Sequence, residues 1–83
     1  MQITIKLYAM LSEYLPAGAV KNVGTLQVEE NAAVGAVVKQ LQLPRELVHL
    51  VLLNGVYVAP ESHFETHLQE ADTLAIWPPI AGG

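Results

Sequence analysis

Apolar and polar residues alternate near both ends of the chain with the period of two that is typical of β-strands. Over residues 2–7 every second residue is a large aliphatic one, and over 73–77 Leu74 and Ile76 face the side opposite to Trp77. Residues 25–29 alternate in the same way. The nearly continuous apolar run 48–53 is separated by Asn54-Gly55 from 56–58, and Asn-Gly accepts positive φ at both central positions of a tight turn. The pattern predicts five short strands, with one hairpin formed by the first two and another by the next two.

Two segments between these strands follow the helical period instead. A short first helix is expected where Met10, Leu11, Tyr14 and Leu15 recur at helical offsets before Pro16. The main helix is expected to be capped by Asn31 and to end before Pro44, with its apolar face formed by Val34, Val37, Val38 and Leu41. Gly35 costs this helix about 1 kcal/mol relative to alanine, which suggests a close contact with a strand.

The order of elements is therefore β, short α, β, α, β, β, β. It predicts an α+β domain in which one face of a mixed sheet of about five strands packs on one main helix. The connection from the second to the third strand is too long for a hairpin, so a crossover through the helix is expected. Eighty-three residues leave room for one domain, which we assign to residues 1–77, followed by an extended tail at 78–83.

Composition narrows the possible chemistry. The chain has no cysteine, which excludes disulfides, thiolate metal sites and cysteine nucleophiles. Its net charge is −4, and its four basic residues are scattered along the sequence, which argues against nucleic acid and anionic membranes as partners. Apolar residues make up 52% and charged residues 14% of the chain, so we expect an exposed apolar patch and a protein partner. With no basic leader and no run of 18 apolar residues, a cytoplasmic location is expected.

The most distinctive segment is the tail that follows the last strand, Pro78-Pro79-Ile80-Ala81-Gly82-Gly83. Two prolines prevent strand pairing and stiffen the exit of the chain. Six extended residues reach roughly 20 Å, and the last three carry almost no side chain. Such a thread can carry its terminal carboxylate into a narrow tunnel of another protein. A frayed terminus of small residues is the ordinary alternative.

The segment from Ala71 to Gly83 resembles the ending of the small ubiquitin-like sulfur carriers of the MoaD/ThiS type, which have the β-grasp fold. The resemblance covers the whole chain, because the Asn54-Gly55 turn and the loop and helix at 30–41 also fall where that family has them. The Pro-Pro-x-x-Gly-Gly form is more similar to the small subunit of molybdopterin synthase than to the thiamine-pathway carrier. The family commonly has a glycine before the aspartate that corresponds to Asp72, and this chain has Ala71 there instead.

The resemblance implies that Gly83 is the working residue. An E1-like adenylating enzyme would use ATP to form the Gly83 acyl-adenylate, and a persulfide sulfur would then displace AMP to leave a thiocarboxylate. The large subunit of molybdopterin synthase would accept the tail, and the sulfur would pass to a cyclic pterin precursor in molybdenum cofactor biosynthesis. The protein would act as a cosubstrate or small subunit, with no self-contained catalytic site and no intrinsically bound cofactor. Residues Ala81 to Gly83 are expected to be mobile in the free domain and ordered in the complex.

Other candidate sites have ordinary interpretations. His63 and His67 have the spacing of a metal pair but no third ligand, so we expect solvated loop histidines and no metal site. His49 is expected to be a partly buried or sheet-face residue. The first and last strands are parallel neighbours in a β-grasp sheet, so the resemblance implies that Tyr8 and Trp77 lie side by side on the sheet face opposite the helix, as surface aromatics or as a partner-binding patch.

Several functions stay open at this point. A sulfur carrier of the thiamine or a thionucleotide pathway would follow the same chemical logic as a molybdopterin carrier. A ubiquitin-like module could instead bind other proteins, or be joined through Gly83 to their lysines, without delivering sulfur.

Overall fold

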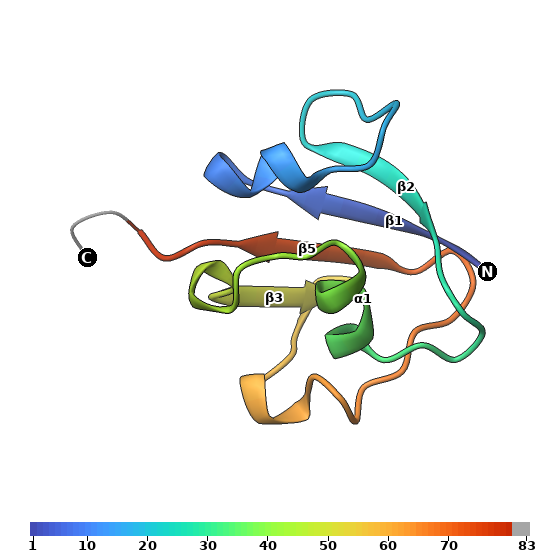
Figure 1. Cartoon of the computed structure of the whole chain (residues 1–83). Coiled ribbons are helices and arrows are strands. Elements are labelled where there is room, and N and C mark those ends of the chain that lie inside the picture. The colour runs from blue at the N-terminus through green and yellow to red at the C-terminus, as the bar shows by residue number, and fades with distance from the viewer. Residues whose placement is uncertain (81–83) are drawn as a thin grey trace.

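The alternating segments of the sequence form a mixed five-stranded sheet in the computed structural model, which describes residues 1–80 (Figure 1). The strands are β1 (Gln2–Leu7), β2 (Val23–Gln27), β3 (Leu50–Leu53), β4 (Val56–Tyr57) and β5 (Thr73–Trp77). The α-helix is α1 (Val34–Gln40), and three short 3-10 helices are η1 (Ala9–Tyr14), η2 (Arg45–Leu47) and η3 (Pro60–Ser62).

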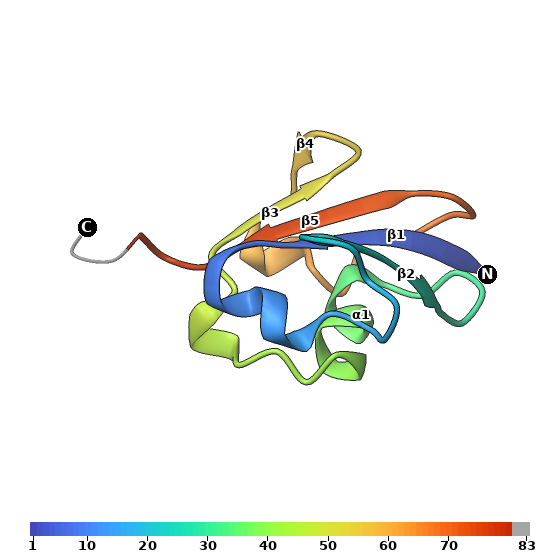
Figure 2. The same ribbon diagram turned by 90° about the horizontal axis from the view of Figure 1, so that it is seen from above.

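The sheet has the strand order β2-β1-β5-β3-β4. β1 and β5 lie parallel at its centre, with Ile5 opposite Leu74 and Leu7 opposite Ile76, whereas the other pairs are antiparallel. The chain crosses from β2 at one edge to β3 near the other through α1, which confirms the predicted crossover. In Figure 2 the α-helix and the 3-10 helices lie on one face of the sheet, and the other face carries no helix within residues 1–80.

The core lies between the sheet and α1, as the strand and helix periods predict. Leu74 and Ile76 of β5 are fully buried, and they belong to the same core cluster as Val34 and Val37 of α1, which are also fully buried. Burying such aliphatic side chains supplies the main stabilisation of a domain of this size. The core cluster also contains the inward residues of the other strands and loops: Ile3, Ile5, Leu7, Leu11, Val28, Leu43, Val51, Val58 and Leu68.

Some predicted boundaries were wrong. β2 begins at Val23, because its register with β1 continues one residue beyond Gly24. The apolar run at 48 does not enter the sheet before Leu50, because η2 ends only at Leu47 and the two residues after it form an irregular link to β3. The first helix has 3-10 geometry, which places Leu11 in the core and leaves Met10 half-exposed. The Asn54-Gly55 turn is confirmed, with φ values of 50° and 83°.

The start of α1 corrects another prediction, because Asn31 does not cap it. Ala33 precedes the helix without a side-chain cap, and Asn31 adopts a left-handed φ of 62°. The first helical N–H groups are satisfied instead by backbone carbonyls of a distant loop: Val34 N donates to Thr66 O at 2.9 Å, and Gly35 N donates to His63 O at 2.9 Å. Since these acceptors lie about thirty residues away in the sequence, a local capping rule could not identify them.

Gly35 makes the close contact that its helical position suggested, but with a loop and not with a strand. A Cβ atom placed on Gly35 would lie 2.6 Å from the ring of Phe64, which follows η3 in the chain. Phe64 is 56% exposed, so its ring can swing away, although it would leave the contact with the helix. The glycine therefore admits an aromatic ring against the helix backbone.

We expect Gly35→Ala and Phe64→Ala to be coupled in stability. In the Phe64→Ala background, Gly35→Ala is expected to raise the free energy of unfolding by about 1 kcal/mol, the helix propensity of alanine over glycine. In the wild-type background the displaced ring should offset most of that gain. Urea unfolding of the four proteins in a double-mutant cycle measures the coupling. Additive effects would show that the ring does not depend on this glycine.

The turn before β5 is built around Asp72. Its carboxylate accepts hydrogen bonds from Gln69 N at 2.8 Å and from Asn54 Nδ2 at 2.9 Å, and Asn54 Oδ1 accepts one from Thr73 N at 2.9 Å. Asp72 thus ties the β3–β4 turn to the start of β5. Ala71, just before it, has a φ of 72°, a left-handed conformation that favours glycine.

Ala71→Gly is expected to stabilise the domain by about 0.5–1 kcal/mol, because it relieves left-handed strain at a smaller cost in unfolded-state entropy. Urea unfolding checks this. Ala36→Gly is the matched control: Ala36 is an exposed residue within α1, and there the same replacement should destabilise by about 1 kcal/mol. Destabilisation by both replacements would contradict the assigned strain.

Candidate functional site

The end of β5 is fixed by hydrogen bonds from both sides. Tyr8 N, just past β1, donates to Ile76 O at 3.3 Å, and His49 N, just before β3, donates to Trp77 O at 3.0 Å. The strand is therefore held up to its last residue by its two neighbours. Pro78 follows directly and can donate no backbone hydrogen bond, so sheet pairing stops there.

The first residues of the predicted tail leave the domain at this fixed point. Pro78 is buried against the body of the domain, whereas Pro79 is exposed and Ile80 is 82% exposed. Figure 1 shows this segment continuing past the end of the sheet, away from the other elements. Ala81, Gly82 and Gly83 lie outside the described part of the chain. The predictions of a reactive carboxylate on Gly83 and of mobility in these three residues therefore stay predictions.

Tyr8 and Trp77 lie together at the base of this exit, as the sequence predicts. Their rings stack with centroids 4.3 Å apart and planes 3° from parallel. Both residues are half-buried, because each ring covers one face of the other. Since Leu74 and Ile76 face the core, the alternation of β5 directs Trp77 to the opposite sheet face, on which no helix lies among residues 1–80.

This aromatic pair continues into a row of apolar residues across the same face. Leu50 lies opposite Trp77 in the β3–β5 register, and Leu52 lies opposite Tyr57 in the β3–β4 register. Residues directly opposite each other in antiparallel strands share a face. We call Tyr8, Trp77, Leu50, Leu52 and Tyr57 the outer apolar stripe. Tyr57 is 57% exposed, so the stripe ends in an accessible aromatic ring.

The three histidines do not form a common site. η3 ends at Ser62, so no helical turn joins His63 to His67. The exposed His67 has Nδ1 2.7 Å from Asn31 O, and His49 is exposed beside the end of β5. Within residues 1–80, no three His, Cys, Asp or Glu side chains come together as metal ligands do. The prediction of a solvated loop residue was wrong for His63, whose Nε2 is buried.

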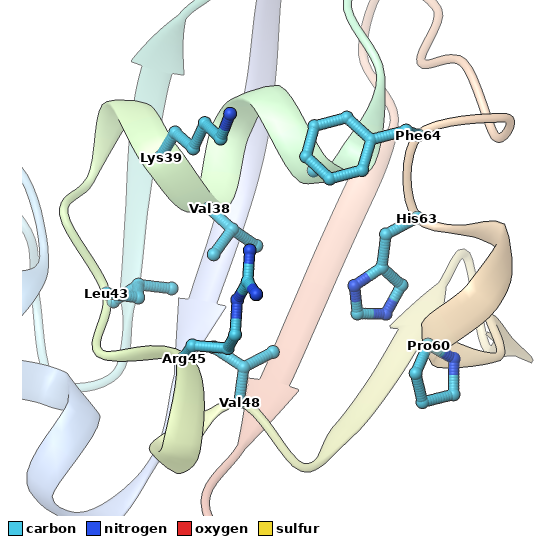
Figure 3. Close-up of a pocket in the computed structure, with 9 residues that line it drawn as sticks. Val38, Lys39, Leu43, Arg45, Val48, Pro60, His63 and Phe64 are labelled. Carbon is cyan, nitrogen blue, oxygen red and sulfur yellow. The ribbon is translucent and has the colours of Figure 1, made fainter.

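A cavity of about 420 Å³ between α1, η2 and η3 was not predicted from the sequence (Figure 3). It is lined by Lys39, Arg45, His63, Phe64 and apolar residues of α1 and the loops that follow it. The one related signal in the sequence is the glycine within the helix, Gly35, because the absence of a side chain there lets Phe64 form part of the cavity wall. Among residues 1–80 there is no helix long and apolar enough to cross a membrane.

Solved structures with the same architecture span the whole chain. The HVO 2177 protein of Haloferax volcanii matches with a TM-score of 0.77 and 26% identity, over 100% of this chain and 87% of that one. SAMP1 of the same organism matches with a TM-score of 0.67 and 27% identity over the full length of both chains.

A protein–protein complex of subunits 1 and 2 of the molybdopterin-converting factor from Helicobacter pylori also contains this fold. The match has a TM-score of 0.62 and 16% identity and covers 100% of both chains. No curated protein matches the chain.

The family comparison covers almost the same part of the chain as these structures. The model of the ThiS family matches residues 8–83, nearly the whole chain. The α+β fold is thus the β-grasp fold expected from the sequence, with a mixed five-stranded sheet on one main helix. The protein belongs to the ThiS family of MoaD/ThiS-type ubiquitin-like sulfur carriers.

Proposed function

We propose that this protein is the small subunit of a molybdopterin synthase and carries sulfur as a thiocarboxylate on Gly83. The observation that carries the proposal is the exit of the chain from β5. Backbone hydrogen bonds from the β1 side reach Ile76 and those from the β3 side reach Trp77, the last residue of β5, and Pro78-Pro79 then lead away from the domain. A tail that starts from a fixed point has a defined reach, which a reaction in another protein's tunnel requires.

The proposed chemistry activates a carboxylate that is by itself a poor electrophile. A Gly83 carboxylate oxygen attacks the α-phosphorus of ATP, and pyrophosphate leaves to give the acyl-adenylate. The terminal sulfur of an enzyme persulfide then attacks the acyl carbon and displaces AMP. A thiol finally cleaves the sulfur–sulfur bond, forming a disulfide and releasing the thiocarboxylate. The chain has no cysteine, so both the persulfide and the thiol belong to partner proteins.

The outer apolar stripe is the proposed docking surface for the adenylating enzyme and for the synthase large subunit. The Tyr8–Trp77 stack lies at the base of the tail, so a partner that binds the stack also orients the tail. Aromatic residues are enriched among the energetically dominant residues of interfaces. In Helicobacter pylori the protein with this fold was solved in a complex with a second subunit, which supports a large-subunit partner here.

The choice of the molybdopterin pathway is supported by the Pro-Pro-x-x-Gly-Gly ending and by the fold shared with that converting factor. It can be tested by mixing the thiocarboxylated protein with the synthase large subunit and the cyclic pterin precursor. The carrier is expected to return to its carboxylate mass as a dithiolene product forms. If only a thiazole-forming or RNA-thiolating system consumed the thiocarboxylate, the pathway would be wrong although the carrier chemistry held.

A second function is favoured by one comparison. The chain is 27% identical over its full length to SAMP1, a small archaeal modifier protein. By this analogy Gly83 would be joined to lysines of other proteins. Intact-mass measurement distinguishes the two functions, because conjugation adds the mass of a whole protein, whereas a thiocarboxylate adds only the difference between sulfur and oxygen.

A further inference from the structure

The cavity between α1, η2 and η3 is large enough for a small ligand. Its volume of about 420 Å³ falls within the range of roughly 300–1,000 Å³ that is usual for small-molecule sites. Much of its wall is apolar, with Val38 of α1, Val48 after η2 and the ring of Phe64 among the lining residues. Such a wall suits an aromatic or other apolar body.

The polar groups of the cavity are cationic in a chain whose net charge is −4. Lys39 and Arg45 are two of the four basic residues of the chain, and both line this cavity. Within residues 1–80 neither lies within 4 Å of a carboxylate, since the one ion pair there joins the N-terminus to Glu30. Lys39 Nζ lies 5.2 Å from the centroid of the Phe64 ring. Unpaired cations beside an apolar wall favour an anionic ligand.

His63 supplies a third polar group. Its Nε2 is buried and has no hydrogen-bond partner among the described residues, so Nδ1 is the ring nitrogen that can face a ligand. Figure 3 shows the His63 ring and the Arg45 side chain on opposite walls of the hollow. In this view the His63 nitrogen nearer to Arg45 is Nδ1, so a ligand oxygen between the two side chains could accept from both when Nδ1 carries the proton of the imidazole.

We propose that this cavity binds a small organic anion, with an apolar body that bears one carboxylate or phosphate group. The Arg45 guanidinium holds the anionic group through paired N–H donors, and His63 Nδ1 donates a further hydrogen bond. Lys39 adds the second positive charge, and the apolar body packs against Val38 and Phe64. The site is built by α1 and the 3-10 helices, whereas the outer apolar stripe is on the helix-free face of the sheet. Ligand binding therefore goes beyond the proposed sulfur transfer and can fail or hold independently of it.

The test is a titration of the full-length, ¹⁵N-labelled protein with four probes: benzoate, phenyl phosphate, benzyl alcohol and inorganic phosphate. Benzoate or phenyl phosphate is expected to shift the amide resonances of Gly35, Lys39, Val48 and His63 in a saturable way. The stronger of the two identifies the anionic group as carboxylate or phosphate. Benzyl alcohol, which lacks the charge, and inorganic phosphate, which lacks the apolar body, should bind at least about tenfold more weakly.

Arg45→Gln is expected to weaken the better probe by about tenfold or more, because it removes a charge-assisted hydrogen-bond donor. Arg45 is exposed, so the melting temperature should change little. Lys6→Gln is the matched control, because it removes one positive charge from β1 and Lys6 does not line the cavity. It should leave the affinity unchanged.

Three results would overturn the proposal. The first is the absence of a saturable shift with either anionic probe up to about 10 mM. The second is equal weakening by Arg45→Gln and Lys6→Gln, which would indicate only a long-range effect of net charge. The third is binding of an acidic peptide at these resonances without binding of the small anions, which would identify a protein-docking site instead.

Discussion

Adding one residue after Gly83, or deleting Gly83, is expected to abolish ATP–pyrophosphate exchange with the adenylating enzyme. The reason is geometric: the reacting carboxylate must sit at one distance from the fixed end of β5, and one residue shifts it by about 3.5 Å. The circular dichroism spectrum and melting temperature should stay nearly unchanged, because the buried core cluster ends at Ile76. Exchange assays and thermal unfolding of the same samples measure both quantities.

Ala81→Gly is the control for this pair of variants, since it keeps the length of the tail and adds no side chain. It should retain exchange. Normal exchange by the extended protein would mean that the carboxylate of Gly83 is not the group activated.

Trp77→Ala and Leu74→Ala are expected to have opposite effects, because these residues lie on opposite faces of β5. Leu74 is fully buried, so its truncation should cost roughly 2–5 kcal/mol of stability. Trp77 is half-buried and stacks on Tyr8 beside the tail exit. Its truncation should weaken binding to the adenylating enzyme or the large subunit by about thirtyfold, equivalent to about 2 kcal/mol.

Stability and binding have to be measured for both variants to separate these roles. Urea unfolding gives the first, and titration of the folded protein with its partner gives the second. Trp77→Ala should lose less stability than Leu74→Ala, and Leu74→Ala should bind normally per folded molecule. If Trp77→Ala unfolded the domain and left the binding per folded molecule unaltered, the outer apolar stripe would be a structural feature and not a docking surface.

The sequence predicted the features of the fold that depend on local period and turn chemistry. The alternation at 2–7 and 73–77 located β1 and β5 to the residue, and Asn54-Gly55 identified the β3–β4 turn. The resemblance to the β-grasp family placed Tyr8 beside Trp77, because the first and last strands are neighbours in that fold, and the alternation of β5 directed Trp77 away from the core.

The features that the sequence did not predict depend on contacts between distant segments. The N–H groups that begin α1 are satisfied by carbonyls of His63 and Thr66, so Asn31 is not needed as a cap. Likewise Lys39 and Arg45 are six residues apart in the sequence, and only the fold brings both to one cavity with His63. The spacing of charged residues along a chain does not reveal which of them will line the same cavity.

The most direct test of sulfur carriage is the intact mass of the protein isolated from cells that contain its adenylating enzyme and a persulfide donor. If Gly83 carries the sulfur, the mass increases by the replacement of one oxygen by sulfur, the change is located by fragmentation on Gly83, and it is absent when the adenylating enzyme is removed. An unchanged carboxylate in the presence of both partners, or a sulfur atom located on any other residue, would contradict it.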